Sequence, residues 1–335
     1  MTKKKKKISE KEKKKRKLIF IIFLFSITLI MLTSATYAWF SSNKNGLIDS
    51  IDINVATLNG LQISHNAIDW SNEINKEQLE TAIQTYRGAF NQFPDTLYGI
   101  SSAGDVVNGK MNMFFGSTDE TSDGNYTITA VQESEINCVG DEECEGHHYI
   151  AFDVFLLTNT KVDLVVTANS SVVNRDAYDT GGQNSARIAF VNEGTVDSTS
   201  NPLVAQGLLS GNRSIIWEPN YDVHTNGGVE QARRFYSINT STSGSPRLPY
   251  HGINQAFDTP VYLSETKNSR YFTAMNPDIA TTMVFNTDQD LMSIPAGITK
   301  LRIYMWLEGE DVDFENNASN GKLTFNLEIA MKSLY

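Results

Sequence analysis

Residues 149–157 read Tyr-Ile-Ala-Phe-Asp-Val-Phe-Leu-Leu (YIAFDVFLL), an apolar stretch that a single aspartate interrupts. A short apolar run that is rich in aromatic and β-branched residues is typical of a strand buried on both faces. Asn159-Thr160 follow as turn residues, and residues 162–167 (VDLVVT) resume an apolar pattern. The sequence therefore predicts that residues 149–157 and 162–167 form an antiparallel pair of strands in the core.

The same pattern of short apolar segments and polar turns extends in both directions from this pair. Further strands are expected at 48–55, 61–63, 126–131, 186–191, 214–217, 282–285, 301–307 and 323–331. About ten short strands with polar connections are typical of a β-sandwich. We expect a mainly β protein, a jelly-roll-like antiparallel β-sandwich with long loops and one or two short helices, preceded by an N-terminal signal or transmembrane helix.

Two stretches depart from the strand pattern. Residues 75–87 form the best helix candidate, because Asn75 and Gln78 resemble a capping box and the apolar residues that follow share one face. Loop insertions are expected around 65–120 and around 195–260, where Gly and Pro residues accumulate. Long loops on a β scaffold usually carry the binding surface.

The N-terminus has the three parts of an export signal. Lys and Arg fill most of residues 3–17, residues 18–32 are almost entirely apolar, and small residues follow up to Ala38. A positive block, an apolar block and a small-residue exit indicate a signal peptide. We expect residues 1–38 to be the signal peptide, cleaved between Ala38 and Trp39. Residues 39–335 then form the extracellular β-sandwich domain.

An uncleaved membrane anchor is the alternative interpretation of the same segment. Residues 18–40 would form a helix about 34 Å long at 1.5 Å per residue. Such a helix would cross a bilayer core of roughly 30 Å. Under both interpretations the positive block stays in the cytoplasm and the bulk of the chain lies outside the cell.

The charge of the chain changes sharply once the signal segment is removed. The whole chain has 28 Lys and Arg residues and 39 Asp and Glu residues. The part after Ala38 has a net charge of about −20, which gives it no electrostatic reason to bind nucleic acid. The charge would keep the protein soluble and could attract divalent cations.

The two cysteines, Cys138 and Cys144, lie close together in the sequence. Outside the cell they can oxidise, so we predict a disulfide that clips the tip of a hairpin. The loop that it closes is short, so the chain-entropy model gives at most about 2 kcal/mol of stabilisation. A zinc site with His147 and His148 is the alternative, but the spacing matches no usual zinc motif.

Acidic residues are densest from Glu308 to Glu315. Carboxylates and loop carbonyls are suitable Ca²⁺ ligands, so a calcium site at Glu310, Asp311 and Asp313 is one hypothesis. The segment lacks the glycine and the closing glutamate of an EF-hand loop. A solvated loop between two strands is the other interpretation.

The sequence contains none of the common hydrolase motifs. There is no H-E-x-x-H, no G-x-S-x-G, and no pair of histidines spaced four residues apart. The absence of these motifs does not exclude a catalytic triad formed by residues distant in the sequence. We therefore predict a protein that is not an enzyme, with no catalytic residue, and no cofactor other than the calcium ion just considered.

Two segments resemble one family of exported bacterial proteins. Residues 34–40 (SATYAWF) are similar to the export signal of the TasA/camelysin group. The region from Leu301 through Trp306–Asp313 to Leu323–Leu327 resembles the closing strands of proteins that carry this signal. The resemblance implies cleavage by a dedicated signal peptidase, a jelly-roll sandwich, and matrix fibres on Gram-positive cells.

These observations lead to three functional hypotheses. The first is a secreted structural protein of the cell surface or the extracellular biofilm matrix, which forms fibres by addition of its N-terminal strand to a neighbour. Its partners would be the signal peptidase during export, further copies of itself and other matrix proteins. The second is a surface adhesin or glycan-binding module that uses the loops at 195–260. The third and least favoured is an extracellular peptidase.

The cleavage site can be tested directly on secreted protein. Because Thr36 and Ala38 are small enough for the −3 and −1 pockets of a signal peptidase, the mature chain should begin at Trp39 or within a few residues of it. Intact-mass analysis and N-terminal sequencing would measure this. Recovery of full-length chain alone, in the membrane fraction, would instead establish the anchor.

Overall fold

The structure is a computed structural model that describes residue 17 and residues 46–56, 61–86, 90–174, 181–245, 247–314 and 322–332. The chain divides into two units, residues 1–38 and residues 39–335, and the following description concerns the second. The predicted signal peptide lies outside the described residues except for Lys17, and so does the Ala38–Trp39 junction. No helix among the described residues is long and apolar enough to span a membrane.

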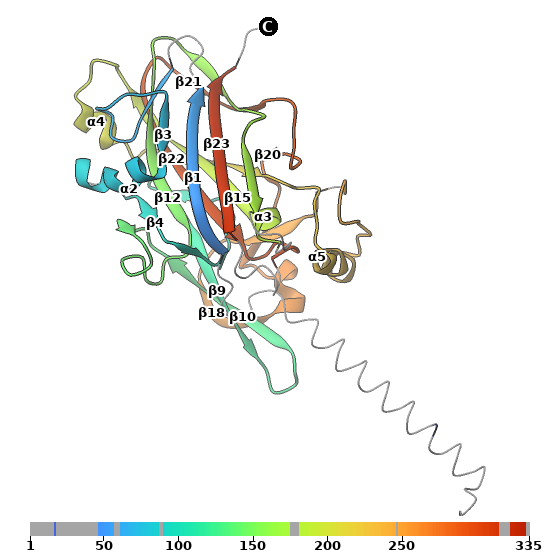
Figure 1. The fold of residues 1–335 in the computed structure, drawn as a ribbon. Coiled ribbons are helices and arrows are strands. Elements are labelled where there is room, and N and C mark those ends of the chain that lie inside the picture. The colour runs from blue at the N-terminus through green and yellow to red at the C-terminus, as the bar shows by residue number, and fades with distance from the viewer. Residues whose placement is uncertain are drawn as a thin grey trace, which may run out of the picture. The chain divides into compact units, whose positions relative to one another are not determined.

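The described fold is mainly β, as the sequence predicts, and two large sheets form its body (Figure 1). The first sheet has the strand order β21-β13-β23-β1-β3, with β14 beside β23 and β5 beside β1. Its strands are β1 (Gly46–Ala56), β3 (Glu73–Asn75), β5 (Thr96–Leu97), β13 (Val162–Val166), β14 (Ser171–Asn174), β21 (Gln289–Ile294) and β23 (Lys322–Met331). The N-terminal strand β1 runs parallel to the C-terminal strand β23.

The second sheet has the order β11-β4-β12-β22-β15-β16-β20, with β2 beside β12 and β6 beside β22. Its strands are β2 (Gln62–Ser64), β4 (Gln92–Phe93), β6 (Gly99–Ile100), β11 (Cys138–Val139), β12 (Ile150–Thr158), β15 (Ala186–Val196), β16 (Ser214–Glu218), β20 (Ile279–Ala280) and β22 (Gly297–Glu308). The long strand β22 is central, and it pairs antiparallel with both β12 and β15.

The main core lies between the two large sheets. Alternate residues of β22 point into it, from Leu301 to Leu307, and meet apolar residues of β12 and β15 in the same sheet. Phe325, Leu327 and Ile329 of β23 face them from the first sheet. Because side chains alternate along a strand, the other residues of β22 must point to the opposite face of the second sheet.

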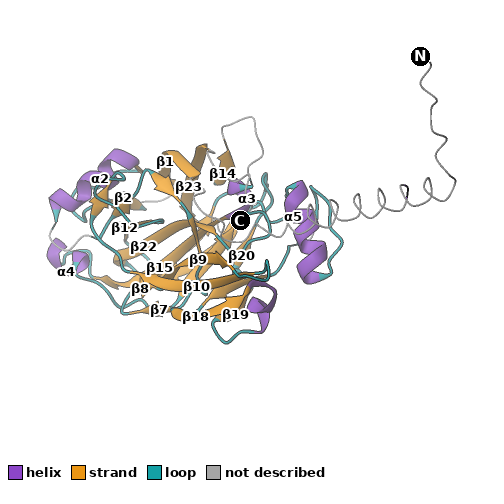
Figure 2. Cartoon of the chain, turned by 90° about the horizontal axis from the view of Figure 1, so that it is seen from below, coloured by secondary structure: helices purple, strands orange, loops and turns teal. Residues whose placement is uncertain are grey.

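That opposite face is covered by a third layer of smaller elements. The layer contains β7 (Val106–Val107), β8 (Lys110–Met111), β9 (Met113–Glu120), β10 (Tyr126–Glu133), β17 (Tyr250–Ile253), β18 (Phe257–Tyr262) and β19 (Phe272–Met275). Met111 and Met113 pack there against Tyr304 and Trp306 of β22. Figure 2 shows the order of the layers, from β1 and β23 through β22 and β15 to β9 and β10.

The helices are short and lie at the edges of the layers. They are α2 (Lys76–Thr85), α3 (Gly182–Ser185), α4 (Pro202–Gln206), α5 (Asn226–Gln231), the π-helical segment η1 (Ala232–Tyr236) and the 3₁₀ segment η2 (Leu263–Asn268). The predicted capping box is confirmed, because Asn75 accepts from the Gln78 backbone N–H and Gln78 accepts from that of Asn75. The expectation of one or two helices was too low.

One pairing predicted from the sequence was wrong. β12 and β13 do not pair, because the chain crosses at 159–161 from the second sheet to the first. Both strands carry apolar residues into the same core, so a crossing satisfies their burial as well as a hairpin would. The strand expected at 61–63 is β2, which pairs with β12.

The predicted loops were also more ordered than expected. The two insertions contain β7, β8, β9, β17 and the start of β18 from the third layer, together with several strands that extend the large sheets. No strand forms at 282–285, and the short β20 (Ile279–Ala280) lies just before it. Several pairs, including β16 with β20, are parallel, so the sandwich is not purely antiparallel.

Candidate functional site

A row of polar and charged side chains runs along the covered face of the second sheet. Lys300, Arg302, Tyr304, Trp306 and Glu308 alternate with the core residues of β22, and each of them is at most 4% exposed. An antiparallel sheet often leaves such a face in water. Here the third layer covers it, so every charge in the row needs a partner within the protein.

Arg302 is the centre of this row. Its guanidinium donates to Asp153 Oδ1 of β12 at 2.8 Å and to Glu135 Oε2 at 2.8 Å. Glu135 lies between β10 and β11, and it also pairs with Lys110 of β8 at 3.2 Å. Lys300 adds a second cation beside Asp153, with 3.1 Å between Nζ and Oδ2. The network therefore ties the third layer to the middle of the sheet.

The pKa of Asp153 follows from these contacts. Burial alone would raise it, but the positive charges of Arg302 and Lys300 hold the pKa below its ordinary value. Glu193 on β15 shows the opposite balance, since burial raises its pKa to about 7. One carboxylate oxygen of Glu193 accepts from the Gly211 N–H at 2.9 Å, and the other has no hydrogen-bond partner among the described residues.

The residues proposed for calcium lie just beyond the end of β22. Asp311 pairs with the guanidinium of the fully buried Arg187. Asp313 accepts from the Thr225 N–H at 2.8 Å and lies 2.7 Å from His224 Nδ1. Protein groups thus already hold both aspartates. Burial raises the pKa of Asp313 to about 6, and the hydrogen bond from His224 opposes this shift.

Glu310 has different surroundings. It is fully buried, and neither of its carboxylate oxygens has a hydrogen-bond partner among the described residues. Burial and the nearby charge of Glu308 hold its pKa well above the ordinary value. Nowhere in the described ranges do three His, Cys, Asp or Glu side chains group so that they could hold a metal ion. Calcium stays a prediction, which the effect of Ca²⁺ on the melting temperature would test.

The cysteines form a disulfide, with their Cα atoms 5.2 Å apart. Cys138 belongs to β11, which pairs in parallel with β4, and Cys144 lies in the turns that follow. The bond therefore closes a loop at the edge of the second sheet, not the tip of a hairpin. His148 follows this loop in the sequence, and its Nδ1 atom pairs with Glu133.

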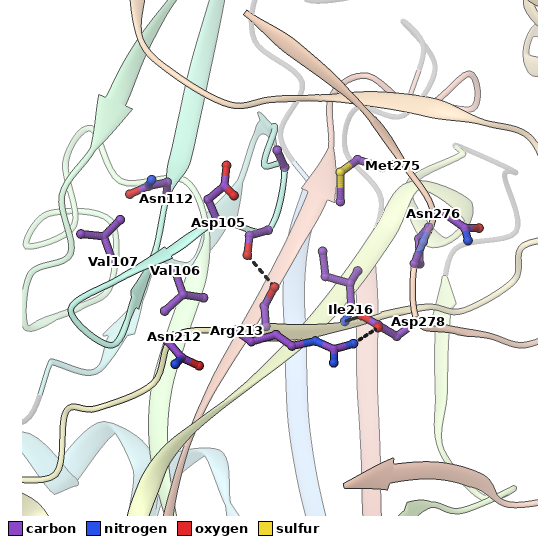
Figure 3. A pocket seen from close by; sticks show the side chains of 14 residues that line it. Asp105, Val106, Val107, Asn112, Asn212, Arg213, Ile216, Met275, Asn276 and Asp278 are labelled. Carbon is purple, nitrogen blue, oxygen red and sulfur yellow. Dashed lines mark hydrogen bonds and ion pairs between the residues drawn. The ribbon is translucent and has the colours of Figure 1, made fainter.

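An open hollow of about 530 Å³ lies at the edge of the third layer (Figure 3). Three segments far apart in the sequence form it, namely 103–107, 212–216 and 275–278, with Asn112 beside them. Its lining combines the amides Asn112, Asn212 and Asn276, the charged Asp105, Arg213 and Asp278, and the apolar Val106, Val107, Ile216 and Met275. This volume is within the range of natural ligand sites.

The walls of the hollow are held by hydrogen bonds. Asp278 accepts from Arg213 at 2.7 Å and from the Ile216 N–H of β16 at 3.1 Å (Figure 3). The Ser214 hydroxyl donates to the Gly104 carbonyl at 2.7 Å. Gly104 has φ +76°, and a Cβ there would come within 2.9 Å of Ile216. A side chain at this position would thus be strained and would crowd the floor.

A second hollow of about 890 Å³ shares a wall with the first. Asn276, Pro277 and Asp278 line both hollows, and Tyr221, Asp288 and Lys332 line the second alone. The binding surface was expected in the loops at 195–260, and only part of the first hollow comes from there. Asp105 and Asp278 were not predicted, because no local motif gives a signal for them.

Comparison with known proteins gives no match to a family model, to a curated protein or to a solved structure. The function must therefore be argued from the residues of this chain.

The stability of the protein should depend on pH through Glu193. Its pKa rises from the ordinary value of 4.5 to about 7 on folding, so the folded state holds the proton more tightly than the unfolded state. The resulting stability is complete below pH 4.5 and is lost as the pH rises to about 7. At 1.36 kcal/mol per pKa unit, the loss is at most about 3 kcal/mol, because solvent screening reduces it.

Urea unfolding at about pH 5 and about pH 8 would measure this loss. Glu193→Gln keeps an oxygen that can accept from Gly211 but cannot titrate, so it should remove that share of the pH dependence. Glu265→Gln, at an exposed position on η2, is the control and should change nothing. Equal pH dependence in wild type and Glu193→Gln would contradict the assignment.

Proposed function

We propose that this chain is an exported structural protein of a bacterial cell surface or extracellular matrix, with no catalytic activity, and that it assembles through its N-terminal strand. The observation that carries the proposal is the position of β1. Figure 1 shows β1 beside β23, the last strand of the chain. The register joins nine residue pairs from Leu47–Lys322 to Ala56–Ala330.

β1 also has partners on its other side. It pairs antiparallel with β3 at 52–54 and with β5 at 46–47. It therefore fills a slot in the first sheet, and its removal would leave the edge of β23 open. An open edge of this length can accept an extended segment from another molecule, which is the principle of β-strand addition.

The place of β1 in the sequence supports assembly after export. It begins eight residues after the predicted cleavage site at Ala38, so cleavage would free the segment that leads into it. If the slot of each subunit receives β1 of the next subunit, the contact is head-to-tail and does not close, so it produces filaments. The aromatic Trp39 and Phe40 at the new N-terminus lie outside the described residues.

The resemblance of residues 34–40 and of the C-terminal strands to the TasA/camelysin group supports the same proposal, as does a jelly-roll interpretation of the sandwich. The charge of about −20 after cleavage would keep free subunits apart, as self-repulsion does in acidic proteins. The signal peptidase, neighbouring subunits and other matrix proteins would be the partners. An uncleaved N-terminal segment would instead hold the protein at the membrane.

Assembly by strand exchange can be tested with single cysteine variants of the mature chain. Asp52 and Asn326 are register partners across β1 and β23. We expect filaments grown from a mixture of Asp52→Cys and Asn326→Cys subunits to give dimers with a short bis-maleimide reagent, because β1 of one subunit lies beside β23 of another. Denaturing gels would show these dimers, and electron microscopy would show the filaments.

Ser117→Cys and Thr129→Cys provide the matched control. These two positions pair within the β9–β10 hairpin, so their mixture should give no dimer. The double variant Asp52→Cys with Asn326→Cys reports the other arrangement, since cross-linking within one monomer would place β1 in its own subunit. Absence of filaments and of mixed dimers across pH and Ca²⁺ concentration would overturn the proposal.

A further inference from the structure

The hollow of Figure 3 has a lining that suits a particular kind of ligand. Asn112, Asn212 and Asn276 line it with amide groups. The Oδ1 atoms of Asn112 and Asn276 already accept from Gln132 at 2.8 Å and from Arg247 at 2.7 Å, so these two offer their NH₂ groups, whereas the Asn212 amide can both donate and accept. A ligand that matches such groups must itself carry several donors and acceptors close together. Hydroxyl groups on a ring meet this requirement, because each one can act as donor and acceptor.

Asp105 adds a carboxylate that the protein leaves available. Its side chain is exposed and forms no hydrogen bond to another described residue, although its backbone carbonyl accepts from the Asn112 N–H. An ionised carboxylate accepts hydrogen bonds through two oxygens, and hydrogen bonds to a charged group are the stronger ones. Asp105 can therefore accept from two neighbouring hydroxyl groups at once.

The charge of the hollow selects against anions. Arg213 is the cation of the lining, and its guanidinium already donates a hydrogen bond to Asp278 Oδ1 at 2.7 Å. The uncompensated charge is that of Asp105, so phosphate, sulfate or carboxylate groups on a ligand would meet repulsion. The apolar Val106, Ile216 and Met275 lie beside these polar groups. They can contact the C–H face of a sugar ring, because that face carries no hydrogen-bonding groups.

The hollow is preformed on one side. Ile216 is buried in β16, and its N–H fixes Asp278, so this wall belongs to the second sheet and not to a free loop. A wall fixed before binding reduces the entropy lost on association.

The shared wall at 276–278 suggests a ligand longer than one sugar ring. A chain that fills the first hollow can cross Asn276 and Asp278 into the second hollow, where Tyr221 forms part of the lining. Tyr221 is half-buried, so part of its side chain is accessible to a ligand. An aromatic side chain offers both an apolar surface and a polar hydroxyl.

We infer that the two hollows on either side of residues 276–278 bind a short oligosaccharide of neutral sugars. The inference does not depend on strand exchange, because none of its residues belongs to β1 or β23. A filament with such sites on each subunit would hold polysaccharide at many points, which raises the overall affinity.

Isothermal titration of the mature protein would test the inference, with chitotetraose, cellotetraose, mannotetraose and maltotetraose as neutral probes. We expect at least one of them to bind, and its hexasaccharide to bind more tightly than its disaccharide. A sulfated tetrasaccharide from heparin should bind at least tenfold more weakly. Asp105→Ala and Asn212→Ala should each weaken binding of the neutral probe about tenfold, which corresponds to the loss of one good hydrogen bond.

Asp258→Ala and Asn268→Ala are the matched controls, because both residues are exposed, on β18 and η2, and neither lines a hollow. They should leave the affinity unchanged. Failure of every neutral probe to bind, stronger binding of the sulfated probe, or equal affinity of the Asp105→Ala and Asn212→Ala variants would each overturn the inference. The cross-linking of β1 to β23 should be the same in all four variants, which separates this test from that of assembly.

Discussion

The ion pairs of Arg302 are the interaction on which the three-layer arrangement depends. Arg302 lies in the middle strand of the larger sheet and is only 2% exposed. Its partners come from two sides, Asp153 from the neighbouring strand and Glu135 from the segment that follows β10. Removing charges from water is costly unless they are paired and hydrogen-bonded. The third layer can therefore cover the charged side chains of β22 only because it brings partners for them.

This arrangement gives the two faces of the larger sheet different tasks. One face forms the apolar core with the first sheet, in which β1 pairs with β23 along nine residue pairs. The other face supports the third layer, whose edge contains the hollow around Asp278. The first hollow is therefore supported by the second sheet, while the second hollow also includes Val165, Gln289 and Asp290 of the first sheet.

The sequence predicted elements better than it predicted their neighbours. The strands at 149–157, 301–307 and 323–331 and the capping box at Asn75 were predictable, because alternation and capping are local signals. Pairing is not local, so the crossing between β12 and β13 and the parallel partner of β1 were missed. Arg302 alternates with apolar residues, as a residue exposed to water would, and nothing nearby reveals that a distant insertion covers it. The hollow was missed for the same reason, since Asp105 and Asp278 meet only after folding.

The central claim, that Arg302 joins the third layer to the sheet, is tested most directly by the unfolding free energy of Arg302→Met. Breaking a buried pair from one side leaves Asp153 and Glu135 without their main cation, so the loss should be about 3–5 kcal/mol. Arg233→Met is the control, because Arg233 forms an exposed pair with Glu230 and should lose no more than about 1 kcal/mol. Adding Glu135→Gln to Arg302→Met should recover part of the loss, because Asp153 keeps Lys300 as its cation and Lys110, which loses Glu135, is partly exposed to water. Equal stability of the Arg302→Met and Arg233→Met variants would contradict the account.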